Sequence, residues 1–127
     1  MRALPLVALL PLLVATCGGV SSSQMVARDK ATSATCDWYQ MCQQIGPNPS
    51  QRYTSRSSCE VDVRAAWETG WPPAECDRKI NQTQLDVCIN RIKSTDCTNV
   101  IDILATITVS CPKEKICSTA ADGGGGQ

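Results

Sequence analysis

The chain has 127 residues, of which nine are cysteine and none is histidine or phenylalanine. Its 12 basic and 12 acidic residues cancel and are interspersed, which excludes the basic surface that nucleic-acid binding requires. Because only 4% of the residues are aromatic, the core must be built from aliphatic side chains and half-cystines, and so small a core needs covalent cross-links. We therefore expect one small disulfide-linked domain and no nucleic-acid partner.

The first 16 residues have the pattern of an export signal. A basic residue, Arg2, precedes an apolar run over residues 3–14, which is too short to span a bilayer as a helix. The sequence LVATC at positions 13–17 resembles the lipobox of bacterial lipoproteins, in which the cysteine becomes the lipidated first residue of the mature chain. Thr16 is a less usual residue at its position in this motif. Residues 1–16 are therefore predicted to be a lipoprotein signal peptide, and Cys17 is the predicted lipidation site.

Cysteine parity supports lipidation of Cys17. The other eight cysteines form an even set that can close four disulfides, whereas nine would leave one odd thiol. The predicted disulfide cysteines are Cys36, Cys42, Cys59, Cys76, Cys88, Cys97, Cys111 and Cys117. A lipidated Cys17 would carry more than one acyl chain, palmitate among them, and stable membrane anchoring requires at least two such groups. Residues 17–30 are predicted to comprise the lipidated cysteine and a flexible tether, since GGVSSS at positions 18–23 is small and polar. Residues 24–30 mix charged and small residues, and they either continue this tether or form the ragged start of a helix.

The same segment predicts the location of the protein. Gly18 is not the aspartate that retains lipoproteins in the inner membrane in the best-known sorting systems, so we expect the cell envelope and its outer membrane. The alternative is an ordinary secretory signal cut within residues 21–23, which would discard Cys17 and release a soluble protein. Either route brings the chain to an oxidising compartment in which disulfides persist.

Residues 31–117 are predicted to form an all-α domain, a small bundle of about four short helices joined by four disulfides, followed by a disordered Gly-rich tail at 118–127. The first helix is expected over residues 33–44, with a stop at the Gly-Pro pair that follows. Cys36 and Cys42 point about 120° apart on this helix, so each should bond to a different partner and not to the other. Eight cysteines allow 105 pairings, and the connectivity stays open.

Two further helices are predicted from caps and from apolar spacing. After a loop at 45–54 that is rich in Pro and polar residues, Ser57 and Glu60 fit a capping box, and Gly70 should end the helix. The apolar stripe of this helix is Cys59, Val63, Ala66 and Trp67. Asn81 then precedes a helix whose apolar residues match the helical spacing completely. These residues are Leu85, Cys88, Ile89 and Ile92.

The last predicted helix begins at a cap formed by Asp96 or Thr98. Its expected buried residues are Cys97, Ile101, Leu104, Ala105 and Thr108. The β-branched run at 107–109 weakens the end of this helix, so its boundary is expected to fall early.

The cysteines form a longer pattern with the residues between them. Its members are Cys36-Asp37, Tyr39, Cys42, Ile45-Gly46-Pro47, Tyr53, Ser55, Cys59, Trp67, Trp71-Pro72, Cys76, Leu85-Asp86-Val87-Cys88, Asp96-Cys97, Cys111 and Cys117. This pattern resembles a family of small cysteine-rich lipoproteins from myxobacteria, a domain of unknown function that is labelled natural product biosynthesis lipoprotein. The resemblance covers most of the chain after Cys17. It implies a membrane-anchored helical domain and assigns no reaction.

The sequence gives little support for catalysis or metal binding. It contains no Cys-x-x-Cys pair and no histidine, so neither a zinc site nor a dithiol redox centre is expected. Nucleophilic catalysis would lack a histidine base. Carboxylate pairs such as Glu60 with Asp62, or Asp86 with Asp96, are more typical of solvated helix faces than of acid–base sites. We expect no catalytic residue, no metal and no cofactor.

Trp67 and Trp71 are the candidate binding residues, because aromatic side chains form contact surfaces for sugars and proteins. Packing of the two rings over a disulfide core is the more common role for such a pair. The sequence predicts a non-catalytic, membrane-anchored cell-envelope lipoprotein that binds an unknown envelope protein or ligand. The alternative is a soluble secreted cysteine-rich effector or inhibitor without a lipid anchor. An envelope enzyme that uses carboxylates is a third, unsupported alternative.

Overall fold

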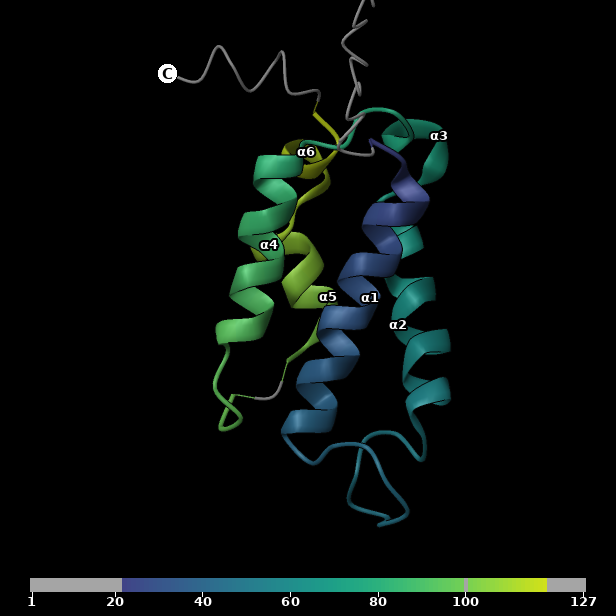
Figure 1. The fold of residues 1–127 in the computed structure, drawn as a ribbon, viewed down its shortest axis with the longest axis vertical. Helices are drawn as coiled ribbons and strands as arrows, with labels where there is room; N and C mark the ends of the chain where they lie inside the picture. Colours follow the sequence, from purple (N-terminus) through teal and green to yellow (C-terminus); the bar gives the residue numbers. More distant parts are fainter. Residues whose placement is uncertain (1–21, 100, 119–127) are drawn as a thin grey trace, which may run out of the picture.

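The structure of the protein is a computed structural model that describes residues 22–99 and 101–118. The side chain of Leu104 lies outside this description. The predicted signal peptide, Cys17 and the tail from residue 119 onward lie outside this part. Its helices are α1 (Gln24–Met41), α2 (Arg56–Gly70), α3 (Pro73–Cys76), α4 (Gln82–Ser94), α5 (Ile103–Ala105), the π-helix η1 (Thr106–Ser110) and α6 (Lys113–Ile116). In Figure 1, α1 lies between α2 and α4 and contacts both. The predicted all-α fold is confirmed.

Helix α1 is longer than the sequence predicted. Of the two interpretations of residues 24–30, the structure confirms the start of a helix, because α1 begins at Gln24, and the tether prediction is wrong for these residues. The side chain of Gln24 is 2% exposed, and its Nε2 donates to the carbonyl of Trp71 at 2.6 Å. The backbone N–H of the same residue donates to the carboxylate of Asp77 at 3.1 Å. Both partners are about 50 residues away in the sequence, which is why local patterns did not reveal this anchored start.

The far end of α1 also differs from its prediction. The helix ends at Met41 and not at residue 44, because Gln43 adopts a left-handed conformation with φ of 57°. The N–H of Gln44 then donates to the carbonyl of Tyr39 at 2.7 Å, which closes the helix end in the way a glycine usually does. A non-glycine residue at this position hides the stop from a sequence pattern, and the Gly-Pro pair lies beyond it.

Helix α2 begins earlier than predicted and has a different cap. Ser55 is its N-cap, and its hydroxyl accepts from the N–H of Ser58 at 3.1 Å, while the hydroxyl of Ser58 accepts from the N–H of Ser55 at 3.2 Å. The proposed box of Ser57 with Glu60 is therefore wrong, since a serine two residues earlier makes the same reciprocal bonds. Burial of the apolar stripe of α2 is confirmed for Cys59, Val63 and Trp67, and Ala66 is half-buried.

The last predicted helix is wrong in its start and in part of its buried face. Residues 95–99, 101 and 102 are not helical, and the chain then passes through the short α5 into η1. Cys97, Ala105 and Thr108 are exposed, whereas Ile101 and Ile107 are buried. The N–H of Cys111 donates to the carbonyl of Thr106 five residues earlier, the widened spacing of a π-helix. This widening places Ile107 directly against α2.

Four disulfides join elements that are distant in the sequence. They pair Cys36 with Cys59, Cys42 with Cys97, Cys76 with Cys117, and Cys88 with Cys111. The first joins α1 to α2, and the second joins the end of α1 to the segment after α4. The prediction that Cys36 and Cys42 bond to different partners is confirmed.

Candidate functional site

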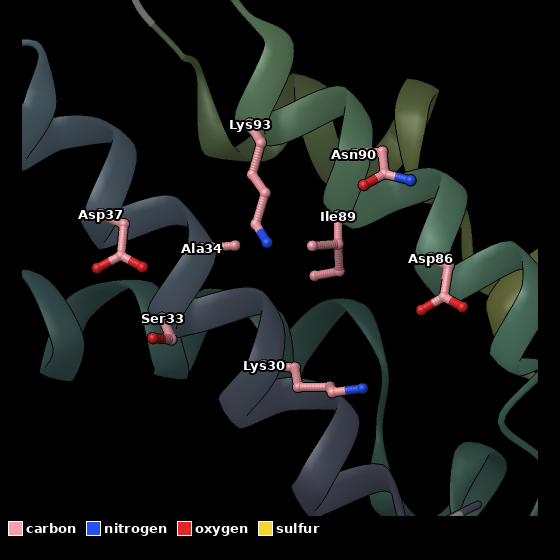
Figure 2. Close-up of a pocket in the computed structure, with 8 residues that line it drawn as sticks. All are labelled: Lys30, Ser33, Ala34, Asp37, Asp86, Ile89, Asn90 and Lys93. Atoms are coloured by element: carbon pink, nitrogen blue, oxygen red, sulfur yellow. The ribbon is translucent and has the colours of Figure 1, made fainter. Parts of the chain in front are cut away.

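A groove of about 410 Å³ runs between α1 and α4. Figure 2 shows side chains from both helices lining it, with α1 below and α4 above. The lining residues are Lys30, Ser33, Ala34, Asp37, Asp86, Ile89, Asn90 and Lys93. On each helix they recur every three or four residues, so each set lies on one helix face. The groove is therefore the seam along which two faces meet without closing.

Small side chains on α1 keep this seam open. Ala34 is 4% exposed and Ile89 is half-buried, and together they give the groove an apolar floor. The hollow continues towards the end of α1 for about another 250 Å³, where Trp38 and Met41 add apolar lining beside Asp37 and Lys93. Met41 is 63% exposed, so the sulfur-bearing side chain is available to a partner. The groove thus gains apolar surface towards the end of α1, while Asp37 and Lys93 line both of its parts.

The groove also holds polar and charged groups that have no partner within the described chain. Lys30, Asp86 and Lys93 make no ion pair or hydrogen bond through their side chains among residues 22–99 and 101–118, and Asn90 makes none either. Two ammonium groups, one carboxylate and one amide therefore face solvent along the seam. Such a lining favours a ligand that carries an acidic group beside an apolar one, because the cations outnumber the free carboxylate.

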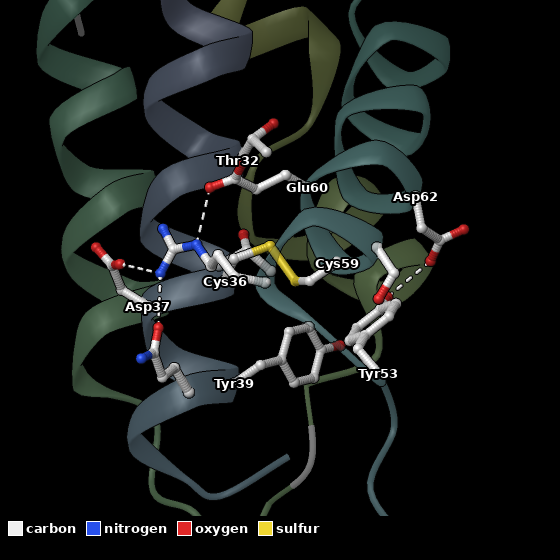
Figure 3. Close-up of a disulfide and its surroundings, with 12 residues drawn as sticks. Thr32, Cys36, Asp37, Tyr39, Tyr53, Cys59, Glu60 and Asp62 are labelled. Atoms are coloured by element: carbon white, nitrogen blue, oxygen red, sulfur yellow. Dashed lines mark hydrogen bonds and ion pairs between the residues drawn. A yellow bond between two sulfur atoms is a disulfide. The ribbon is translucent and has the colours of Figure 1, made fainter. Parts of the chain in front are cut away.

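The remaining carboxylate of the groove, on Asp37, is held by an arginine of α2. Arg56 donates from Nη1 to Asp37 at 2.6 Å and from Nε to Glu60 at 2.8 Å. Figure 3 shows these bonds beside the Cys36–Cys59 disulfide. The hydrogen bond to Glu60, followed by the one to Asp37, raises the pKa of the guanidinium. Asp37 is therefore a fixed wall of the groove and not a free ligand.

Two tyrosines pack at the other side of the same disulfide (Figure 3). The hydroxyl of Tyr39 donates to the carbonyl of Ile101 at 2.7 Å, and that of Tyr53 donates to the carboxylate of Asp62 at 2.7 Å. The rings meet edge to face at 5.3 Å, with the guanidinium of Arg52 5.5 Å from the Tyr39 ring centroid. Burial raises the pKa of Tyr39 to about 12. Both hydroxyls are engaged by the fold, which gives this cluster a structural role.

The two tryptophans that were the sequence-based binding candidates lie in the core. Trp67 and Trp71 are both 0% exposed, with ring centroids 4.5 Å apart, so the more common packing role is confirmed and the alternative of a contact surface is wrong. The Nε1 of Trp71 donates to the carbonyl of Cys111 at 3.0 Å, which fixes the ring inside the core. The sequence could not distinguish the two roles, because burial of a tryptophan depends on what packs over it.

The other candidate residues are accounted for within the part of the chain that the structure describes. All eight cysteines there are paired, and no cluster of residues in that part could hold a metal ion. Of the four candidate carboxylates, Asp62 is engaged by Tyr53 and Glu60 by Arg56, Asp86 lines the groove, and Asp96 is exposed outside the groove lining. None of the described helices is long and apolar enough to cross a membrane.

These features define the class of the protein: an all-α domain cross-linked by disulfides, with an open groove between two helices. The model of a family described as "Family of unknown function (DUF6184)" matches residues 36–119, and the chain belongs to that family. The first two thirds of α1, which include Lys30, precede the matched region. No curated protein and no solved structure matches the chain.

Sequence reasoning missed the groove, although part of the signal is visible. Lys30, Ser33 and Asp37 recur at helical spacing, and so do Asp86 and Lys93. That spacing predicts two polar faces on two helices. It contains no information on whether the two faces meet, which depends on how α1 and α4 pack.

Proposed function

We propose that this protein is a non-catalytic lipoprotein of the cell envelope, anchored through acyl chains on Cys17, and that it binds a segment of another envelope protein in the α1–α4 groove. The observation that carries the proposal is the groove itself, whose unpartnered lysines and exposed Met41 match a segment with an acidic and an apolar side chain. A groove of this kind suits recognition of a short segment, since a few pockets along a seam give specificity.

Cysteine pairing supports the anchor. The eight cysteines of the described part bond to one another, so Cys17 has no cysteine of its own chain left to bond with. The lipobox-like LVATC sequence favours lipidation of that thiol. Outer-membrane location and membership among myxobacterial lipoproteins belong to this proposal, supported by Gly18 and by the cysteine pattern respectively.

The anchor is tested by the intact mass of the protein from the membrane fraction, after thiol alkylation without reduction. We expect a chain that starts at an acylated Cys17 and carries no alkylated cysteine. A soluble chain that begins after Cys17 would overturn the anchor and would favour the secreted effector or inhibitor instead.

The groove is tested by site-specific photo-crosslinking in cells. A photoreactive amino acid at Asn90 lies in the groove, and the same amino acid at Val87, which is 40% exposed on α4 outside the groove, is the matched control. We expect a discrete product from position 90 that is absent from position 87 and is lost when Lys30→Glu and Lys93→Glu reverse the charge of the lining. Equal products from both positions, or a product that survives the charge reversal, would refute binding in the groove.

A further inference from the structure

One end of the domain gathers elements from three parts of the chain. The first turn of α1, the short α3 and α6, and the segment between α3 and α4 lie together at the top of Figure 1. Covalent and hydrogen bonds hold them there: Cys76 of α3 is bonded to Cys117 after α6, and the N–H of Asn81 donates to the carbonyl of Ile116 at 2.8 Å. We call this group the α1-start end. The loop at 42–55 lies at the opposite end (Figure 1).

The length of chain before α1 limits how far this end can lie from the predicted anchor. Ser23, the N-cap of α1, is only six residues after Cys17. Six fully extended residues span at most about 22 Å, since each covers no more than about 3.6 Å. An 18-residue helix such as α1 is about 27 Å long, so the tether is shorter than the domain it carries. The α1-start end must therefore stay close to whatever surface holds Cys17.

The surface of this end has the chemistry that a phospholipid layer binds. Met25 and Val26, adjacent in the first turn of α1, are 58% and 41% exposed. Arg78, Lys79 and Lys115 are exposed, and their side chains have no ion pair or hydrogen bond to any other described residue. Adjacent apolar side chains beside cations are the combination that inserts at the headgroup boundary and attracts anionic lipid.

The carboxylates at the same end are mostly engaged. Glu75 accepts from Lys113 at 2.9 Å, and Asp77 accepts from the N–H of Gln24. Glu114 makes no hydrogen bond or ion pair with any other described residue. The bond from a neutral N–H leaves the charge of Asp77 uncancelled, so three unpaired cations stand against two carboxylates, Asp77 and Glu114, and the net charge of this end is positive.

We propose that the α1-start end docks on the membrane that holds Cys17, with Met25 and Val26 at the headgroup boundary and Arg78, Lys79 and Lys115 against lipid phosphates. The inference rests on the proposed lipid anchor. The domain then stands on one end, the loop at 42–55 is farthest from the bilayer, and the α1–α4 groove opens sideways where a neighbouring envelope protein can enter it.

Lysine acetylation of the lipidated full chain tests this orientation. The protein is reconstituted in vesicles of equal parts phosphatidylethanolamine and phosphatidylglycerol, treated with an amine-reactive ester, and compared by peptide mass spectrometry with the same protein in neutral detergent. We expect Lys79 and Lys115 to react severalfold more slowly in vesicles, and Lys30 and Lys93 in the groove to react equally in both.

The outcomes separate the two proposals. A chain that carries no acyl group or does not float with the vesicles contradicts the anchor. A chain that floats while Lys79 and Lys115 react as fast as in detergent overturns the docking alone, and so does protection spread evenly over all four lysines. In the variant Met25→Asp, which changes an exposed side chain, the protein should still float through its acyl chains, but protection of Lys79 should fall towards the detergent value. Undiminished protection in that variant would also overturn the docking.

Discussion

Replacement of each buried tryptophan by phenylalanine should separate hydrogen bonding from packing in the core. Trp67 and Trp71 are both 0% exposed, so each Trp→Phe change removes a similar volume from a fully buried site. Trp71 donates from Nε1 to the carbonyl of Cys111 at 3.0 Å, whereas Nε1 of Trp67 is buried without an acceptor among the described residues. The two variants therefore differ mainly in what happens to one N–H group.

The difference has a definite sign. Loss of a partner that leaves a buried polar group unsatisfied costs about 1–3 kcal/mol, and removal of a donor that was already unsatisfied recovers a similar amount. Trp71→Phe leaves the carbonyl of Cys111 without its indole donor, while Trp67→Phe removes the unpaired N–H. We therefore expect Trp71→Phe to lower the free energy of unfolding by at least about 2 kcal/mol more than Trp67→Phe.

Guanidinium unfolding followed by circular dichroism measures this difference, with disulfides intact and Cys17→Ser in every variant to prevent lipidation. Trp38 supplies a control, because its Nε1 donates to the carbonyl of Thr95 at 2.6 Å and its side chain is as deeply buried. Trp38→Phe should behave like Trp71→Phe. Equal losses for Trp67→Phe and Trp71→Phe, or a larger loss for Trp67→Phe, would refute the reasoning.

Three other predictions follow from the same core. Gly70→Ala should destabilise the domain by about 1–3 kcal/mol despite the better helix propensity of alanine, because the added Cβ would lie 2.5 Å from Cγ2 of Ile107. In an Ile107→Ala background the same change should become stabilising. Thermal unfolding of the parent, the two single variants and the double variant gives the coupling energy between the two positions. The raised pKa of Tyr39 adds folding stability that is complete below the ordinary value of 10 and is lost as pH rises through about 12. Absorbance of the Tyr39 tyrosinate should therefore appear together with alkaline unfolding. Reversible ionisation of Tyr39 near pH 10 in the folded protein would contradict this. Under limiting reductant the Cys42–Cys97 bond should open first, because Cys97 is exposed while every other disulfide has at least one fully buried cysteine. Differential alkylation with peptide mapping gives the order in which the four disulfides are reduced.

Local patterns in the sequence predicted the helices whose stabilising signals are also local. Asn81 caps α4 as expected, and its side chain accepts from the N–H of Gln84 at 3.1 Å. The apolar spacing from Leu85 to Ile92 gave the buried face of that helix, because a 3.6-residue period is a property of the helix alone. Patterns failed where the signal came from another part of the chain, as at Gln24, which is held by Trp71 and Asp77.

The π-helix η1 shows the same limit for a different reason. Its β-branched residues indicated a weak helix end, and that much follows from side-chain crowding. The widened turn itself places Ile107 against Gly70 of α2, a contact between segments 37 residues apart. Only the packed structure contains that contact, so no spacing rule could have found it.

By itself, the sequence determined the all-helical class, the even set of eight disulfide cysteines and the expectation of export, because composition, parity and helical period are properties of the chain. Tertiary structure decided which cysteines pair, that both candidate binding tryptophans are buried, and that the polar faces of α1 and α4 meet in an open groove. Each of these depends on which surfaces pack together. Packing is settled by the free energy of the whole fold, to which segments distant in the sequence contribute jointly.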